Sequence, residues 1–148
     1  MLSAISPDRD ALVDGLRGLA YLLHHLAPLF LMCDVRDLGS WLGDAAPPEP
    51  GRDAAPPGPR VLTTERTRAR LLAAEQFEPT IYLYDNQPGG VGLTERLFEL
   101  VAPLLARARE TLRTCSCRAG CPSCVGPVNE VGRRAKPMAV ALLHRLIG

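Results

Sequence analysis

Four of the five cysteines in this 148-residue chain lie within ten residues, in the pattern C-x-C-x3-C-x2-C. They are Cys115, Cys117, Cys121 and Cys124. Four thiolates this close in sequence can all reach one tetrahedral metal ion, and Zn²⁺ held by four cysteine sulfurs at about 2.3 Å is a closed, structural kind of site. The pattern therefore predicts a metal-stabilised loop over residues 115–124, which we call the knuckle, rather than an active site.

Three other chemistries can use clustered cysteines. Disulfides are disfavoured, because Cys115 and Cys117 are too close to pair comfortably and a bond between Cys121 and Cys124 would be strained. A redox dithiol usually opens a helix after a strand, whereas a Gly/Pro-rich loop follows here. An iron–sulfur cluster also takes four cysteines, although the bacterial ferredoxin run spaces them differently. Zinc is the leading prediction, and these alternatives stay open.

The length of the chain suits one domain with a core of its own, over residues 1–148, and a hydrophobic content of 47% agrees with this. No apolar run reaches the length of a membrane span, because two adjacent histidines interrupt the longest candidate. Asp8, Asp10 and Asp14 occupy the start of the chain, where a secretory signal would be basic and then apolar. Clustered cysteines without such a signal indicate a reducing cytoplasm, so we expect a cytoplasmic protein without a membrane partner.

Charge is distributed unevenly along the chain. From Pro103 to Gly148 eight basic and two acidic side chains give +6, which leaves −5 for the first 102 residues of a chain with a net charge of +1. A basic C-terminal third around a metal site suits contact with a polyanion such as DNA, although a solvated helix face has the same charge pattern. The candidate DNA contacts are the basic residues nearest the knuckle: Arg113, Arg118, Arg133, Arg134 and Lys136.

Hydrophobic periodicity predicts a mainly helical α+β domain with a small β-sheet. A first helix is expected from the capping signal Ser6-Pro7-Asp8 to about Phe30, with a leucine stripe and a kink or restart at Pro28. An extended segment ends at Trp41, and the proline-rich residues 43–59 are expected to form a flexible loop. The remaining expected elements are a helix over 65–75 with solvated arginines, a strand over 80–85, a helix over 93–112 bent at Pro103, a loop after Gly126 and a last helix opened by Pro137.

A strand, a glycine-rich turn and a helix follow one another between residues 80 and 93. The turn contains Asp85, Gly89, Gly90 and Gly92. Glycines let a ligand approach the backbone, and a helix N-terminus favours anions. The segment nevertheless has neither the Lys-Ser/Thr pair of a P-loop nor the G-x-G-x-x-G fingerprint. We therefore predict a structural turn that docks the helix on the strand, with a phosphate site as the alternative.

Three segments together resemble the MrfA-like zinc-binding domain, which lies at the C-terminus of DEAD/DEAH-box DNA helicases of the mitomycin repair factor A type. The segments are Met32-Cys33-Asp34 with Asp37-Leu38-Gly39, Tyr84-Asp85 with Pro88-Gly89-Gly90-Val91-Gly92, and the cysteine run with its internal Gly120-Cys121-Pro122. The resemblance extends from about Asp10 to Leu146, and residues 43–59 match it least.

The resemblance implies that the four knuckle cysteines bind one structural Zn²⁺. Cys33, outside the cluster, is expected to be a small buried apolar residue, with an alternate zinc ligand as the weaker alternative. It implies an accessory role in a 3′–5′ ATP-dependent DNA helicase in DNA repair, with single-stranded or forked DNA and the helicase motor as partners. The same domain occurs in helicase-like phage-defence proteins. This chain has no Walker A or Asp-Glu-x-His motor motif, so it is not expected to hydrolyse ATP by itself.

Two further functions are compatible with the sequence. A protein-interaction scaffold would dock a helicase motor or a phage-defence subunit without touching DNA. A small hydrolase or nuclease would hold a divalent metal with Asp34, Asp37 and Asp85 and use His24 or His25 as a base. Aspartates near turns usually cap the backbone and paired histidines on a helix are usually structural, so the hydrolase is the weaker hypothesis.

Overall fold

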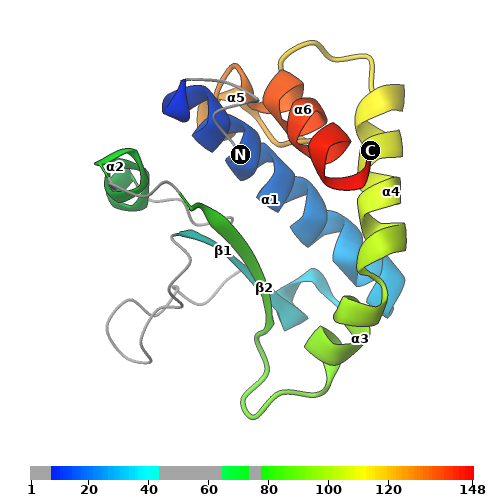
Figure 1. Ribbon diagram of the computed structural model, residues 1–148. Coiled ribbons are helices and arrows are strands. Elements are labelled where there is room, and N and C mark those ends of the chain that lie inside the picture. The colour runs from blue at the N-terminus through cyan, green and yellow to red at the C-terminus, as the bar shows by residue number, and fades with distance from the viewer. Residues whose placement is uncertain (1–7, 44–64, 74–77) are drawn as a thin grey trace.

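The computed structural model describes residues 8–43, 65–73 and 78–148, and every structural statement below concerns these residues. A long central helix, α1 (Arg9–Leu31), has a two-stranded sheet on one side and the helices α4 and α6 on the other (Figure 1). The remaining elements are η2 (Val35–Asp37), β1 (Leu38–Gly43), α2 (Glu65–Ala73), β2 (Thr80–Asp85), α3 (Leu93–Glu99), α4 (Val101–Thr114), α5 (Val128–Val131) and α6 (Ala135–Ile147). The predicted α+β fold, mainly helical with a small sheet, is confirmed.

Helix α1 is capped by Asp8, whose carboxylate accepts the N–H groups of Asp10 and Ala11 at 3.0 and 3.3 Å. An aspartate at this position satisfies backbone donors that have no partner within the helix. The helix therefore begins at Arg9, later than the capping signal suggested, and Ser6-Pro7 lies outside the described residues.

Pro28 does not restart α1, contrary to one of our expectations. A proline has no N–H, so the helix loses the bond that would reach the carbonyl of His24, yet it continues to Leu31. Met32 then adopts a left-handed conformation with φ of 55°, and its N–H and that of Cys33 both bond to the carbonyl of Pro28. The proline thus lies in the last turn of one continuous helix.

Helix α1 is buried on almost all sides because the sheet covers one face and α6 and α4 cover another. The leucines of the predicted stripe are at most 8% exposed: Leu12, Leu16, Leu19, Leu23 and Leu26. Phe30, the last residue of that stripe, is only partly buried. Each fully buried leucine contributes about 1.5–3 kcal/mol relative to an exposed one, which makes α1 the centre of the core. Within the described ranges, no helix has both the length and the apolar character that crossing a membrane requires.

The sheet confirms the predicted strand and the predicted extended segment. Strands β1 and β2 pair antiparallel from Leu38 opposite Asp85 to Gly43 opposite Thr80. Gly43 is therefore the last residue of β1 instead of the first residue of the predicted flexible loop, and residues 44–59 of that loop lie outside the described residues.

The helix predicted over residues 93–112 is two helices. Helix α3 ends at Glu99 and α4 begins at Val101, with Leu100 between them in a non-helical conformation (φ −99°, ψ 7°). Pro103 explains the break, because its ring excludes the carbonyl of Glu99 and it has no N–H to bond that carbonyl. Pro103 itself lies in the first turn of α4, where a missing N–H costs no helical bond.

The segment after the knuckle is more regular than the sequence predicts. Residues of the expected loop form the one-turn helix α5. Helix α6 begins at Ala135, two residues before Pro137, which again occupies a first turn.

Five charged side chains meet beside the N-terminal half of α1, and we call them the ion-pair cluster: Asp8, Asp10, Asp14, Arg68 and Arg134. Arg68 bonds Asp10 at 3.1 Å and Asp14 at 3.2 Å, while Arg134 bonds Asp10 at 2.8 Å and also pairs with Asp8. The prediction that Arg68 is solvated is wrong, since its side chain is only 19% exposed. The cluster ties α1 to α2 and to the residue that precedes α6.

Gly132 makes room for this cluster. Its φ is 102°, and a Cβ atom there would lie 2.2 Å from the carboxyl carbon of Asp14. Glycine alone combines that conformation with that close approach.

His24 is fully buried and predicts a pH-dependent loss of stability. Its Nε2 lies 2.9 Å from the carbonyl oxygen of Leu38, and its Nδ1 has no partner among the described atoms. Burial lowers the pKa of His24 below the ordinary value of 6.5, with a smaller contribution from His25. The unfolded chain therefore binds a proton that the folded chain resists, and the free energy of unfolding falls as the pH drops below 6.5, by at most about 1.4 kcal/mol per pH unit.

The variant His24→Gln isolates this effect, because its amide can still donate to Leu38 but cannot titrate. We expect urea unfolding of the zinc-saturated protein between pH 7.5 and 5 to show a smaller loss in the variant than in the wild type. Protonation of the cysteines contributes to both proteins and cancels in the comparison. Equal losses in the two proteins would contradict the assignment.

Candidate metal centre

The four knuckle cysteines point their sulfurs at one point. The Sγ atom of Cys115 lies 3.5 Å from the Sγ atoms of Cys117 and Cys121. The Sγ atom of Cys124 lies 3.4 Å from that of Cys117 and 3.6 Å from that of Cys121. All four sulfurs lie within 4.8 Å of one another. A tetrahedron with zinc–sulfur bonds of about 2.3 Å has edges of about 3.8 Å, so the donor set fits a single Zn²⁺.

Two pieces of secondary structure position these ligands. Cys115 is the C-cap of α4, and its N–H bonds the carbonyl of Thr111 at 3.1 Å. The second pair lies on a tight turn in which the carbonyl of Cys121 accepts the N–H groups of Cys124 and Gly126, both at 3.0 Å. The end of α4 thus positions the sulfur of Cys115, and the turn positions those of Cys121 and Cys124. The loop between the helix end and the turn passes over one end of the molecule (Figure 1).

The knuckle is attached to the core by α1 and α6. Cys124 is 1% exposed and belongs to the hydrophobic core. The hydroxyl of Tyr21 on α1 donates to the carbonyl of Pro122 at 3.1 Å, and the backbone N–H of Lys136 on α6 bonds the carbonyl of Ala119 at 3.2 Å. Losing the metal would therefore disturb the packing of both helices.

The thiols differ strongly in acidity. The N–H of Cys117 and hydrogen bonds from neighbouring thiols lower the pKa of Cys115 to about 7. Burial raises the pKa of Cys117 and raises that of Cys124 to about 12. A metal that binds all four sulfurs must displace these protons, so zinc binding releases protons and weakens as the pH falls.

The alternatives for the cysteines can now be compared with the structure. All five are free thiols, so the structure has no disulfide among its described residues. Cys33 lies outside the group of four sulfurs, and it is half-buried rather than buried as predicted. Over residues 8–43, 65–73 and 78–148, no other set of three or more histidine, cysteine or carboxylate side chains brings its ligand atoms close enough together to hold a metal ion.

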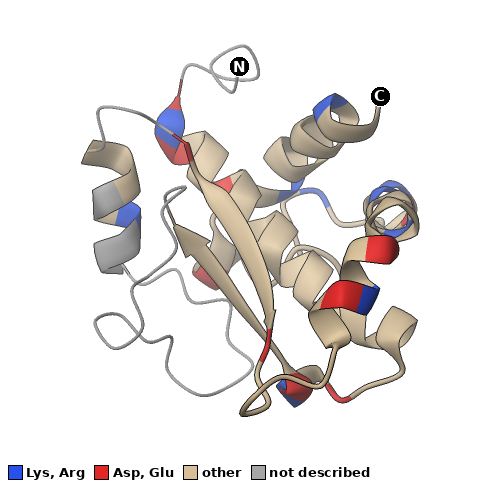
Figure 2. Ribbon diagram, turned by 60° about the horizontal axis from the view of Figure 1, so that its bottom comes forward, with Lys and Arg blue, Asp and Glu red and all other residues tan. Residues whose placement is uncertain are grey.

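The basic residues predicted to contact DNA fall into three groups. Arg118 and Arg133 are exposed and form no ion pair with any described residue. Arg113 is exposed but bonds Glu110, at 2.8 and 2.9 Å. Arg134 has a side chain that is 42% exposed but is engaged in the ion-pair cluster, and Lys136 is buried against the knuckle, 8% exposed. Figure 2 shows further basic positions along α4 and at the C-terminal end of α6.

The glycine-rich turn is organised by Asp85. Its carboxylate accepts the N–H groups of Gln87 at 3.0 Å and Val91 at 2.6 Å, and these bonds, Val91 first, hold the pKa of Asp85 below its ordinary value. Gly89, Gly90 and Gly92 all have positive φ, which is the reason for three glycines here. This geometry supports the structural turn that the sequence predicted.

The aspartates proposed for a hydrolase are used in the same structural way. Asp34 and Asp37 form a reciprocal cap around η2, and Asp37 also accepts the side-chain amide of Gln87 at 2.7 Å. His24 is sealed in the core, and the ring of His25 bonds the carbonyl of Tyr21 at 2.8 Å. The described residues therefore give no support to a second, catalytic metal site.

Comparison with known proteins agrees with the site. The model of the family described as the MrfA Zn-binding domain matches residues 19–125, which include all four knuckle cysteines. The chain is 30% identical over 131 residues to the uncharacterized ATP-dependent helicase YprA of Bacillus subtilis (strain 168), a match that covers 88% of this chain and 14% of that protein. It is 38% identical over 72 residues to the uncharacterized protein MJ1572.1 of Methanocaldococcus jannaschii, covering 45% of this chain and 62% of that protein.

The fold is also similar to part of a crystal structure of the DUF1998 helicase MrfA bound to DNA. The TM-score is 0.64 at 29% identity, and the match covers 92% of this chain and 14% of that one. The chain thus spans about a seventh of the helicases that it matches. The family is a zinc-binding one and the four sulfurs have the spacing for one structural zinc, which favours zinc over an iron–sulfur cluster. The chain belongs to the MrfA Zn-binding domain family.

Proposed function

We propose that this chain is an accessory domain of a 3′–5′ ATP-dependent DNA helicase that acts in DNA repair, and that it guides single-stranded or forked DNA beside the motor. The observation that carries this proposal is the pair of exposed arginines, Arg118 in the knuckle and Arg133 before α6, that have no ion-pair partner among the described residues. The similarity to a helicase crystallised with DNA supports it.

Zinc has a structural role in this proposal. When bound, the metal fixes the loop that contains Arg118, so the arginine is presented on a rigid support. A guanidinium meets a phosphate with two hydrogen bonds, which suits backbone contacts that are independent of sequence. ATP hydrolysis would come from motor domains in cis or in trans, because this sequence has no motor motifs.

The same proposal treats residues 1–148 as one domain, since the described helices and strands share a single hydrophobic core. It also implies a cytoplasmic location, where thiols stay reduced and available to zinc.

Reversing the charge of Arg118 and Arg133 to glutamate should weaken the binding of a single-stranded oligonucleotide by about tenfold at low salt. Each lost phosphate contact should also make the plot of log K against log salt shallower by about 0.7, so the double variant should differ in slope by about 1.4. Fluorescence anisotropy with the zinc-loaded protein over a range of salt concentrations measures both quantities.

The matched control is Arg36→Glu with Arg96→Glu. These side chains are 81% and 62% exposed, and they lie on η2 and α3, at the opposite end of the molecule from the knuckle (Figure 1). The control changes the net charge equally, so it should leave the slope near that of the wild type. Unchanged oligonucleotide binding by the Arg118 and Arg133 variant, with zinc still bound, would contradict the proposed role in DNA binding.

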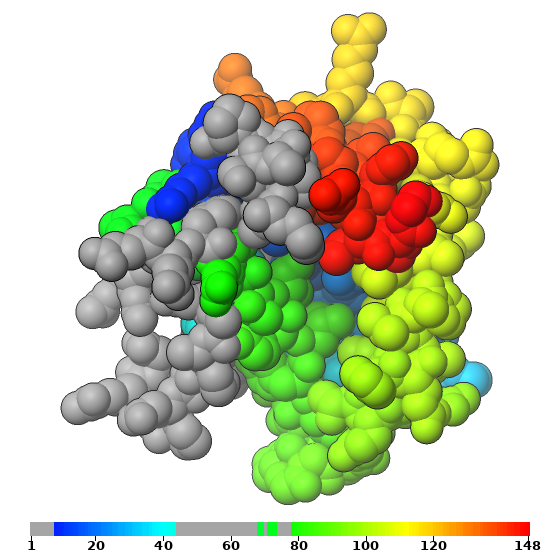
Figure 3. Space-filling model, viewed as in Figure 1, coloured from blue at the N-terminus to red at the C-terminus, as the bar shows by residue number. Residues whose placement is uncertain are grey.

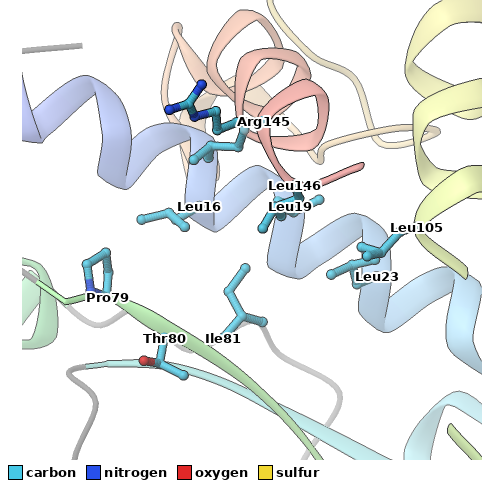
Figure 4. A pocket seen from close by; sticks show the side chains of 10 residues that line it. Leu16, Leu19, Leu23, Pro79, Thr80, Ile81, Leu105, Arg145 and Leu146 are labelled. Atoms are coloured by element: carbon cyan, nitrogen blue, oxygen red, sulfur yellow. The ribbon is translucent and has the colours of Figure 1, made fainter. Parts of the chain in front are cut away.

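The second candidate function is a scaffold that docks a helicase motor or a phage-defence subunit without touching DNA, and one observation favours it. An apolar pocket of about 310 Å³ opens between α1, α6, α4 and the start of β2. Figure 3 shows α1 at the bottom of a hollow between β2 and α6, and Figure 4 shows leucines of α1 and α6 facing Ile81 across it. Loss of the DNA role in the preceding experiment would leave this function as the better one.

A further inference from the structure

Lys136 is the single lysine among the 17 basic residues of the chain, and it is buried beside the knuckle. Its ammonium nitrogen lies 2.7 Å from the carbonyl oxygen of Cys115, donates to the carbonyl oxygen of Cys117, and lies 3.4 Å from the Sγ of Cys117. Three protons thus meet three acceptors. A compact ammonium with three donors suits this tripod of acceptors.

No carboxylate lies within ion-pair distance of Lys136 in the described part of the chain. A buried lysine without a counter-charge is rare, because removing an ammonium from water is costly. The nearest group that can carry a negative charge is the Cys117 sulfur. Four thiolates around one Zn²⁺ have a net charge of −2, and they supply the missing anion.

The positions of two helix ends also indicate a negative charge beside Lys136. Cys115 caps the C-terminal end of α4, so its carbonyl belongs to the negative pole of that helix. Lys136 lies in the first turn of α6, where a positive charge is unfavourable against the helix dipole. A cation placed at the wrong end of its own helix is explained by the anion that it faces.

We propose that Lys136 is the counter-cation and positioning residue of the zinc site. It holds the carbonyls of Cys115 and Cys117 so that both sulfurs face the metal, and it brings the charge of the site from −2 to −1. Its N–H···S contact withdraws electron density from the Cys117 sulfur. That sulfur is then a poorer nucleophile, and the site releases zinc more slowly. The inference rests on the zinc site and is independent of any contact with DNA.

The wild-type protein gives the first test. Zinc-loaded protein is treated with iodoacetamide, in which the sulfur bonds to the methylene carbon as iodide leaves, and alkylation of each cysteine is followed by mass spectrometry. Cys115, Cys117 and Cys121 are all half-buried. We expect Cys117 to be the slowest of the three, and equal rates at Cys115 and Cys117 would overturn the proposal.

The second test compares Lys136→Met, which keeps the length of the side chain and removes its charge, with Lys136→Arg, which keeps the charge. Partners of metal ligands are worth about 10- to 100-fold in metal affinity. We expect zinc transfer to a chromogenic chelator to be at least about tenfold faster in the methionine variant, with Cys117 the cysteine whose alkylation accelerates most, and the arginine variant to lie nearer the wild type.

A lysine that only filled space would give a different pattern of alkylation rates and variant effects. Loosened packing would accelerate alkylation of all the knuckle cysteines together, and both variants would suffer alike. That result, or unchanged zinc transfer in Lys136→Met, refutes the assignment.

Discussion

Replacing Cys124 with serine should abolish stoichiometric zinc binding and leave a chain without a cooperative unfolding transition. Cys124 is both a candidate ligand and a core residue at 1% exposure, so the metal and the packing fail together. Structural zinc contributes about 10–16 kcal/mol in small metal-folded domains, which equals or exceeds the whole stability of a typical domain. Zinc content by mass spectrometry and thermal unfolding followed by circular dichroism measure the two effects.

Cys33→Ser is the matched control for this experiment. Cys33 is half-buried and lies outside the cluster, so the variant should keep one zinc per chain and a cooperative transition. Treatment of the wild type with a strong chelator should reproduce the behaviour of Cys124→Ser. A Cys124→Ser protein that retains one zinc and the wild-type melting temperature would contradict the tetrathiolate site.

Removing the charge at the centre of the ion-pair cluster should have the second largest effect. Asp14→Asn leaves Arg68 and Arg134 without the carboxylate that is 5% exposed between them. Breaking a buried ion pair on one side costs about 3–5 kcal/mol, and we expect about 3 kcal/mol because both arginines keep Asp10 as a partner. Urea unfolding of the zinc-saturated protein at pH 7 gives this difference.

Glu99→Gln is the control, because it breaks an ion pair in which Arg96 and Glu99 are 62% and 63% exposed. Such pairs contribute about 0.5 kcal/mol or less. A loss of similar size in the two variants would show that the cluster has no special role in joining α1, α2 and the segment before α6.

Local signals in the sequence were enough for part of this fold. The spacing of the cysteines predicted a site whose sulfurs do converge, because ligands within a ten-residue stretch need only a short loop to meet. The strand at Thr80–Asp85 and the leucine stripe of α1 follow from side-chain periodicity. Proline had a local effect that the sequence placed less well: Pro103 breaks the helix three residues earlier, at Leu100, whereas Pro28 is accommodated within the last turn of α1.

The roles of the charged residues could not be read in the same way. Arg68 and Arg134 are separated from their aspartate partners by more than fifty residues in sequence, so the residues next to them in the sequence do not indicate an ion pair. Lys136 looked like one more basic residue of a DNA-binding surface until the fold placed it under the knuckle. A charge pattern predicts which residues can meet a polyanion, but three-dimensional partners decide which of them are available.

The partnership of α1 with α6 has a consequence for how the protein is made. Helix α1 packs more extensively against α6 than against any other helix, and their sequences are far apart. A ribosome adding about 5–20 residues per second needs roughly 5–20 s to reach α6 after α1 has been synthesised. Through that interval the apolar faces of α1 lack their final cover, and the last zinc ligands are also missing. Folding of this domain is therefore delayed until the residues after the knuckle have been synthesised, and its yield in a cell depends on shielding of α1 until α6 emerges.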